Sequence, residues 1–297
     1  MKKKSFLAAL MALVMLCTVF SCGITAVAAD DSTAYGADAY SYVQYLDANL
    51  RARRAGTEQE QKAAAYLTGE LESFGYEVAQ QPFSYTSRGA TVNSQNVIVT
   101  KPGRSEKQII VGAHYDSVNT AGVDDNGSGT SVTLETAKRM FGVSTPYTIK
   151  FIFFGAEEAG LRGAKAYAKR HKEELLATET VVLGLDTFRD LKDLAVYDRD
   201  LSGTLKHDKQ AKELVKNAAS NCGLDLPYAS IYIGACDAAA FTQIGVKATG
   251  FAAMDPTPPR YYHTRLDSWE LLEPEAIRTG IEVVTEACCM YDAVGLK

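Results

Sequence analysis

Three short apolar runs, separated by segments with helical periodicity, constrain the fold of this 297-residue chain more than any other feature. The runs cover Gln108–His114, Thr148–Phe154 and 179–186, and helical patterns over 128–141 and 161–172 lie between them. Apolar strands that alternate with helices form a largely parallel sheet, because each crossover helix covers one face of the sheet. The sequence therefore predicts an α/β fold with a mixed, mostly parallel central sheet and helices on both faces.

The remaining segments extend this pattern without a break between domains. Thr57 and Glu60 form a capping-box pattern, which predicts the start of a helix that ends at Gly75. No internal repeat, low-complexity tract or Pro/Gly linker follows the first 29 residues, so a single domain is expected over 30–297. The other expected elements are helices over 40–50, 205–219 and 274–291, strands over 76–85 and 92–100, and short strands near Tyr228 and Ala248.

The N-terminal segment has the composition of an export signal rather than of a folded element. Residues 2–4 are lysines, residues 6–20 are almost entirely apolar, and residues 26–28 read Ala-Val-Ala, which suits cleavage. The apolar stretch is shorter than the ~18 residues that a membrane-spanning helix needs. The sequence predicts a signal peptide over 1–29 and a secreted protein without a membrane span, and a lipid anchor at Cys22 is the alternative.

The charge balance excludes one class of partner. Removal of the signal takes three lysines from the 31 basic residues and leaves 28 against 36 acidic residues, a formal net charge of −8. An acidic chain without a basic stripe lacks the electrostatic footprint of a nucleic-acid-binding protein. No nucleic-acid partner is therefore expected.

The cysteines and two of the histidines are expected to have structural or solvated roles. Cys222 and Cys236 could close a small disulfide loop after export, and the sequence leaves this open. Cys288 lies on an apolar helical stripe and is expected in the core. His171 and His207 have charged neighbours, which favours exposed positions.

Each of the three central runs ends in a side chain that can bind a metal or move a proton. His114 ends the first run, Glu157 and Glu158 follow the second, and Asp186 ends the third. The carboxyl ends of parallel strands meet at one edge of a sheet, where ligands bind in such folds. We therefore expect these side chains to converge.

Three further motifs add candidate groups. In AHYDS, Asp116 is placed to hold the second ring nitrogen of His114. GVDDNGSG brings Asp124 and Asp125 into a tight loop before a helix, where turn formation and helix capping are the ordinary roles of such residues. His263 lies between aromatic residues in RYYHTRLDSWE, where a surface hydrogen-bonding role is the ordinary one.

Taken together, two imidazoles and three carboxylates form a mixed nitrogen and oxygen donor set. Such a set suits zinc, with cobalt or manganese as substitutes. Five protein ligands are too many for one tetrahedral zinc with an open position, but they suffice for two ions if one carboxylate bridges them. The sequence therefore predicts a co-catalytic site with ions ~3.5–4 Å apart.

The motifs, in this order, resemble the family of co-catalytic zinc exopeptidases that includes secreted bacterial leucyl aminopeptidases. Glutamate carboxypeptidases and glutaminyl cyclases are its more distant relatives. The resemblance covers most of the chain after the signal, and each motif is moderately specific whereas their order is highly specific. The motifs are RAGTEQEQKAAAYLTGELESFGYEV, SQNVIV, VGAHYDSV, GVDDNGSG, FFGAEEAGLRGAKAYA, GLDTF and YYHTRLDSWELL.

The resemblance implies a ligand for each position of the two-metal site. Asp124 would bridge the two zinc ions. His114 and Asp186 would complete the coordination of one ion, and Glu158 and His263 would complete that of the other.

The resemblance also implies the catalytic chemistry. Glu157 would be the general base that takes the proton of the bridging water. Asp116 would hold the ring nitrogen of His114 that does not bind the metal. The peptide bond between Asp124 and Asp125 would be cis. The implied activity is that of a secreted metallo-aminopeptidase, a hydrolase that cleaves the first peptide bond of peptides with a free N-terminus.

Two departures from the family pattern leave the substrate open. Thr187-Phe188-Arg189 follows Asp186 where a small apolar pair is usual, and Cys236-Asp237-Ala238 replaces a Ser-Asp segment followed by His or Tyr. Arg189, Arg260 or Arg265 could hold a substrate carboxylate, which keeps a carboxypeptidase-like enzyme as an alternative. A glutaminyl-cyclase-like enzyme with one metal is the second alternative, and a binding protein on an inactive peptidase fold is the non-enzymatic one.

Overall fold

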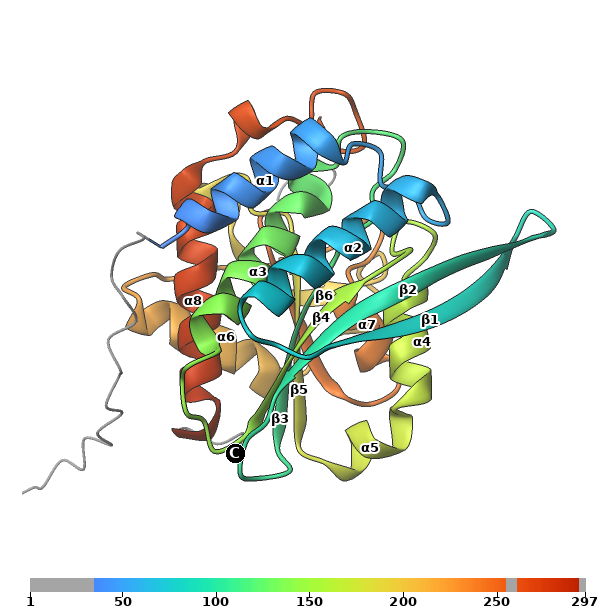
Figure 1. Cartoon of the computed structure of the whole chain (residues 1–297). Coiled ribbons are helices and arrows are strands. Elements are labelled where there is room, and N and C mark those ends of the chain that lie inside the picture. The colour runs from blue at the N-terminus through green and yellow to red at the C-terminus, as the bar shows by residue number, and fades with distance from the viewer. Residues whose placement is uncertain (1–34, 255–260, 294–297) are drawn as a thin grey trace, which may run out of the picture.

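A mixed sheet lies at the centre of the computed structural model, which describes residues 35–254 and 261–293 (Figure 1). The described part contains nine strands in the order β1-β2-β4-β3-β5-β9-β6-β7, and β8 pairs with β6. The strands are β1 Val78–Ser87, β2 Ala90–Lys101, β3 Gln108–His114, β4 Thr148–Phe154, β5 Thr180–Asp186, β6 Ala195–Asp200, β7 Leu205–Lys206, β8 Tyr228–Ser230 and β9 Lys247–Ala252. The predicted signal peptide over 1–29 and the alternative anchor at Cys22 lie outside the described residues.

Parallel pairing is concentrated where the functional side chains are expected. β4, β3, β5 and β9 are parallel neighbours, so their carboxyl ends lie at the same edge of the sheet. β1 and β2 form a long antiparallel hairpin beside β4 (Figure 1). β6 continues the sheet antiparallel to β9. The predicted single α/β domain with a mixed sheet and helices on both faces is confirmed. The sheet is not mostly parallel as expected, because four of the eight strand pairings among the described residues are antiparallel.

Helices cover both faces of the sheet. Residues of α1, α2, α3, α6 and α8 share the larger hydrophobic core with one face, and residues of α4, α5 and α7 share the smaller core with the other. The helices are α1 Ala37–Asn49, α2 Glu58–Ser73, α3 Gly129–Met140, α4 Arg162–Arg170, α5 Lys172–Ala177, α6 Lys209–Asn221, α7 Ala238–Thr242 and α8 Pro274–Ala293. Short helical turns occur at Val123–Ser128, Leu191–Asp193 and Trp269–Leu271.

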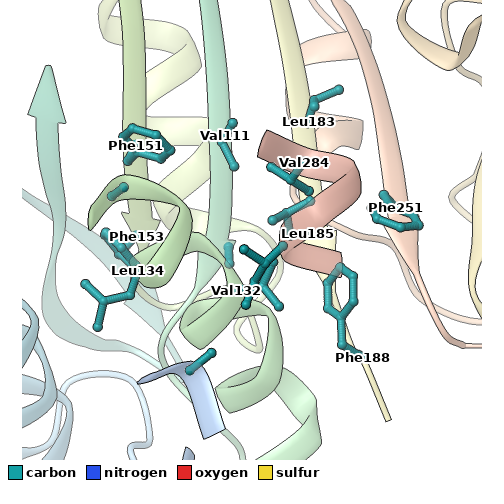
Figure 2. Close-up of a cluster of buried hydrophobic side chains, with 14 of the residues drawn as sticks. Val111, Val132, Leu134, Phe151, Phe153, Leu183, Leu185, Phe188, Phe251 and Val284 are labelled. Carbon is teal, nitrogen blue, oxygen red and sulfur yellow. The ribbon is translucent and has the colours of Figure 1, made fainter. Parts of the chain in front are cut away.

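The central strands are apolar on both faces because both faces are buried. In β4, Phe151 and Phe153 point into the larger core, whereas Ile152 and Phe154 point into the smaller one. This alternation follows from the two-residue period of a strand. Figure 2 shows the larger core, in which Val132 of α3 and Val284 of α8 lie among side chains of the sheet. Burial on both sides fixes the register, and with it the residue at which each strand ends.

The predicted N-terminus of α2 forms with one difference from the expected capping box. Thr57 accepts a hydrogen bond from the Glu60 N–H at 3.4 Å, as predicted. The Glu60 carboxylate accepts from the Gly56 N–H at 2.6 Å instead of from the capping residue itself. Gly75 follows the helix with φ +101°, a conformation that glycine adopts without strain.

Four of the described strands and helices were not predicted from the sequence, namely α5, β6, β7 and α7, and the expected role of one histidine was wrong. The strand Ala195–Asp200 is largely buried, but its charged residues interrupt the apolar pattern that would predict a strand. The helix α7 is too short to show helical periodicity. His207 was expected on an exposed helical face, but it follows β7 and only 2% of its surface is exposed. Its carboxylate neighbour Asp200 explains how a polar ring is accommodated there.

The cysteines of the described part are free thiols. Cys222 and Cys236, for which a disulfide was left open, are not joined. Cys288 is buried in the larger core, as predicted. Within the described residues, no helix is both long and apolar enough to cross a membrane.

We predict that Phe251→Ala lowers the free energy of unfolding by about 3–5 kcal/mol, because it leaves a cavity in the larger core. Phe251 is fully buried and its ring packs edge-to-face on Phe188, 5.2 Å between centroids. Urea unfolding followed by the fluorescence of Trp269, the single tryptophan, measures the change.

Leu176→Ala is the control for this prediction. Leu176 is 50% exposed, so its truncation should change stability by less than about 0.5 kcal/mol. Equal losses in the two variants would contradict the position of Phe251 in the core.

Candidate metal centre

The carboxyl ends of the central strands bring the candidate side chains to one place. β3 ends at His114 and β5 ends at Asp186, while Glu157 and Glu158 follow β4 by three and four residues. His114 and Phe154, the last residue of β4, are paired in register. Parallel pairing therefore places these groups at the same edge of the sheet, as the sequence predicts.

Asp125 is the centre of the arrangement. Its Oδ1 lies 3.2 Å from Nε2 of His114, and its Oδ2 lies 3.1 Å from Nε2 of His263. The two oxygens of one carboxylate thus face two imidazoles from distant parts of the chain. Asp125 is also the residue common to two groups of potential ligand atoms that each lie within 4.8 Å of one another.

The two groups differ in composition and exposure. The first consists of His114, Asp125 and Asp186, all buried, with 3.9 Å between His114 Nε2 and Asp186 Oδ2. The second consists of Asp125, Glu158 and His263, with 3.0 Å between His263 Nε2 and Glu158 Oε2. The second group is the more exposed, which places it on the solvent side of the first.

Asp124, which the family resemblance assigns to the bridging position, points elsewhere. Its Oδ1 accepts hydrogen bonds from the Ser128 hydroxyl at 3.0 Å and from the Phe188 N–H at 3.0 Å. These contacts tie the loop to the segment that follows β5. The carboxylate that lies between the imidazoles belongs to Asp125, because the loop turns its second aspartate, not its first, toward the strand ends.

The cis peptide bond is also one residue later than expected. The resemblance implies a cis bond between Asp124 and Asp125, whereas the structure has it between Asp125 and Asn126. Motif reading located the loop but assigned both features to the preceding residue.

Asp116 organises the site more extensively than the sequence suggests. Nδ1 of His114 lies 3.2 Å from the Asp116 carbonyl oxygen and 3.5 Å from its Oδ1. The same carboxylate accepts hydrogen bonds from the N–H groups of Glu157 at 2.9 Å and of Glu158 at 3.2 Å. One buried side chain therefore orients an imidazole and both glutamates.

Two residues that sequence reasoning missed fix the loop that carries Asp125. Arg53 is completely buried and donates to the carbonyl oxygens of Tyr115, Ala121 and Gly122 at 2.7 to 2.8 Å. The Asp267 carboxylate accepts hydrogen bonds from the backbone N–H groups of Val123 at 2.9 Å and of Asp124 at 2.8 Å. The only sequence signals were the second arginine in RARRAG and an aspartate inside the motif around His263.

Backbone conformation at the site is strained. Ala156, Thr187 and His263 have φ between +50° and +59°, in the left-handed region that non-glycine residues rarely occupy. Each lies beside or within the groups that face the site. Such strain costs about 1–3 kcal/mol per residue and is retained where the surrounding structure enforces it, commonly at functional sites.

The electrostatics show an excess of buried negative charge. Burial lowers the pKa of His114, but the carboxylates around it, Glu157 first, outweigh burial and hold the pKa well above its ordinary value. Burial raises the pKa of Glu157 and Asp186 well above the usual range, and it raises the pKa of Glu158 to about 7. Two imidazoles do not neutralise this many carboxylates.

This donor set fits divalent cations. Imidazole nitrogens and carboxylate oxygens are the ligands that zinc accepts in proteins. Oδ1 of Asp186 is buried and has no hydrogen-bond partner among the described residues. A buried oxygen without a partner lowers the stability of a fold, so such atoms are rare. Dications at the two groups would supply that partner and the missing positive charge. We therefore assign both groups as candidate metal sites that share Asp125.

The comparisons with known proteins identify relatives of this chain. Residues 96–288 match the model of peptidase family M28. The aminopeptidase YwaD of Bacillus subtilis is 34% identical over 210 residues, which cover 68% of this chain and 45% of that protein. The chain spans about half the length of the curated relatives it matches.

Solved structures share the fold. A zinc aminopeptidase from Bacillus subtilis superposes with a TM-score of 0.76 at 22% identity and covers 88% of this chain and 95% of its own. A glutaminyl cyclase from an Acidobacteriales bacterium superposes with a TM-score of 0.77 at 21% identity and covers 89% and 97%. The fold is therefore common to both activities and does not distinguish them.

We predict that Asp125→Asn weakens metal binding and that Asp124→Asn leaves it almost unchanged. An amide at position 125 has one acceptor oxygen and no charge, so it cannot bridge, and the zinc affinity should fall at least tenfold. An amide at position 124 keeps the oxygen that accepts from Phe188, so zinc binding should change little. Zinc titration by calorimetry, with dialysed protein, measures both. Loss of zinc in the position-124 variant alone would restore the assignment made from the sequence.

Proposed function

Because the chain belongs to peptidase family M28, we propose that it is a zinc-dependent aminopeptidase, a hydrolase that removes the first residue of peptides with a free N-terminus. The observation that carries the proposal is the position of Asp125, whose two oxygens face His114 and His263. A shared carboxylate between two groups of ligands is what a co-catalytic pair of metal ions requires.

Each ligand group would hold one zinc ion. His114 and Asp186 would complete the inner ion, Glu158 and His263 the outer one, and Asp125 would belong to both. When bound, the ions would lower the pKa of a shared water and polarise the scissile carbonyl. Asp116 fixes the tautomer and the orientation of His114 through Nδ1, which leaves Nε2 directed at the site. Cobalt or manganese would fit the same donors.

Glu157 is the residue best placed to move protons. It belongs to neither ligand group, yet its Oε2 lies 4.0 Å from His114 Nε2. The hydrogen bond from its N–H to Asp116 fixes its backbone beside the inner group. Its carboxylate can therefore take the proton of the attacking water and deliver it to the leaving amine. In this proposal the two adjacent glutamates have different roles.

The excess of negative charge also favours an N-terminal amine over a C-terminal carboxylate as the group that is recognised. An ammonium group would be stabilised by carboxylates that the metals leave uncompensated. Arg189, one of the three candidate clamps for a substrate carboxylate, is paired with Asp190 and stacked on Tyr261 at 3.8 Å from its ring centroid. Because that guanidinium already has internal partners, Arg189 has less support as the clamp, whereas Arg265 is exposed and Arg260 lies outside the described residues.

The location in the cell is part of the same proposal. The basic and apolar pattern of residues 1–29 supports export and cleavage of a signal peptide, which would leave a peptidase domain over 30–297. The secreted protein would then act on peptides outside the cell. The N-terminal mass of protein recovered from the medium tests the cleavage.

A chelation assay tests the proposed activity. Hydrolysis of leucyl-nitroanilide should fall to background after exhaustive removal of metal and return on addition of zinc, because the water and the carbonyl lose their activation. The N-acetylated substrate should resist cleavage. Activity that survives metal removal, or equal cleavage of the blocked substrate, would refute the proposal. Cyclisation of an N-terminal glutaminyl peptide by protein with one metal ion per chain would identify the cyclase instead.

We predict that Glu157→Gln lowers kcat by about 10²–10⁴-fold while the metal content stays at the wild-type level, since the variant loses only the proton acceptor. Glu158→Gln should lower the metal content instead. Glu173→Gln, on an exposed position of α5, is the matched control and should retain activity. Metal analysis beside steady-state kinetics distinguishes the three, and the reverse pattern at 157 and 158 would exchange the two roles.

A further inference from the structure

A second cluster of metal-binding side chains lies outside the candidate centre. Asp200, His207 and Cys236 offer ligand atoms that all lie within 4.8 Å of one another. Oδ2 of Asp200 is 3.3 Å from Nε2 of His207 and 3.1 Å from Sγ of Cys236. Their exposed fractions are 0%, 2% and 2%, so the cluster is closed to solvent. None of the three belongs to either group around Asp125.

The cluster is built on fixed parts of the fold. Asp200 ends β6, and His207 directly follows β7, the strand that pairs with β6. The N–H of His207 donates to the Asp198 carbonyl oxygen at 2.9 Å. Nδ1 of the His207 ring lies 2.9 Å from the hydroxyl of Thr242, at the end of α7, which directs Nε2 at the other two side chains. A second ring nitrogen held in this way is usual for an imidazole that binds a metal.

We propose that Asp200, His207 and Cys236 bind a structural zinc ion. Sulfur, nitrogen and oxygen donors together are a set that zinc accepts, with bond lengths of about 2.0–2.3 Å. The edges of a tetrahedron with such bonds are about 3.3–3.7 Å, and the two measured separations are close to this range. The fourth position would be taken by a water molecule or by the second oxygen of Asp200. The inference does not depend on the proposed peptidase activity.

Charge supports a dication at this position. A zinc ion with the Asp200 carboxylate, the Cys236 thiolate and a neutral His207 has a net charge of zero, which a buried site requires. Binding would break the S–H bond, form the bond from sulfur to zinc and release the proton to solvent.

The position of the cluster suggests what the ion would stabilise. Cys236 precedes Asp237, a buried carboxylate that contributes to the electrostatics of both Glu157 and Asp186. Besides its Sγ contact, Cys236 donates its N–H to Asp200 Oδ2 at 3.2 Å. An ion held by Cys236 would therefore fix the segment that forms one side of the candidate metal centre.

Cobalt substitution tests the proposal on the full chain. A thiolate bound to Co²⁺ produces charge-transfer absorption in the near ultraviolet, whereas the nitrogen and oxygen ligands around Asp125 do not. Protein expressed in cobalt-supplemented minimal medium should show this band and bind one metal ion per chain more than Cys236→Ser. Cys222→Ser is the matched control, since this thiol lies outside the cluster, and it should keep both the band and the ion.

Two further measurements separate the outcomes. Asp125→Asn should lose metal at the candidate centre but keep the band, so that failure of the proposed function and failure of this inference are distinguishable. If the position-236 variant does not fold, zinc-edge X-ray absorption of the unaltered protein should still show a sulfur scatterer at about 2.3 Å. No band and no sulfur scatterer would overturn the proposal and leave a metal-free cluster in which the thiol and the imidazole donate to Asp200.

Discussion

The site depends on a concentration of buried carboxylates at the edge of four parallel strands. Like charges at this depth repel one another and lose the solvation of water, so they persist only if the fold compensates them. The chain provides part of this compensation through N–H donors to Asp116 and Asp267 and through two imidazoles. The remainder is what divalent cations would supply. Negative charge in excess of the internal partners is therefore the property that connects the fold to the proposed chemistry.

Much of the fold could be predicted because its strands are buried on both faces. Gln108–His114 and Thr148–Phe154 were predicted with the bounds that the structure has, since continuous apolar runs leave little doubt about where they end. Ala195–Asp200 was missed because charged residues interrupt the apolar pattern at the end of a largely buried strand. A run of six residues with three charges does not differ in composition from a loop.

The site was predictable to the level of the motif but not of the individual residue. The convergence of His114, Glu157, Glu158 and Asp186 follows from parallel strands. The choice between Asp124 and Asp125 depends on how a loop turns. Hydrogen bonds from Ser128 and Phe188 to the Asp124 carboxylate, and from the Asp124 N–H to Asp267, decide it. These partners are 4, 64 and 143 residues away in sequence, so local pattern contains no information about them. The same reason explains why Arg53 and the cluster around Asp200 were not predicted.

The bonds from Val123 and Asp124 to Asp267 have a consequence for the order of folding. They join segments separated by 144 and 143 residues and bring the loop of Asp125 to the loop of His263. Closing so long a segment costs entropy that only the assembled sheet and helix α8 can offset. We therefore expect the outer ligand group to assemble late in folding. A polypeptide stalled before its C-terminal part has docked would present the inner ligands without the outer ones, so two-ion binding would mark completed folding.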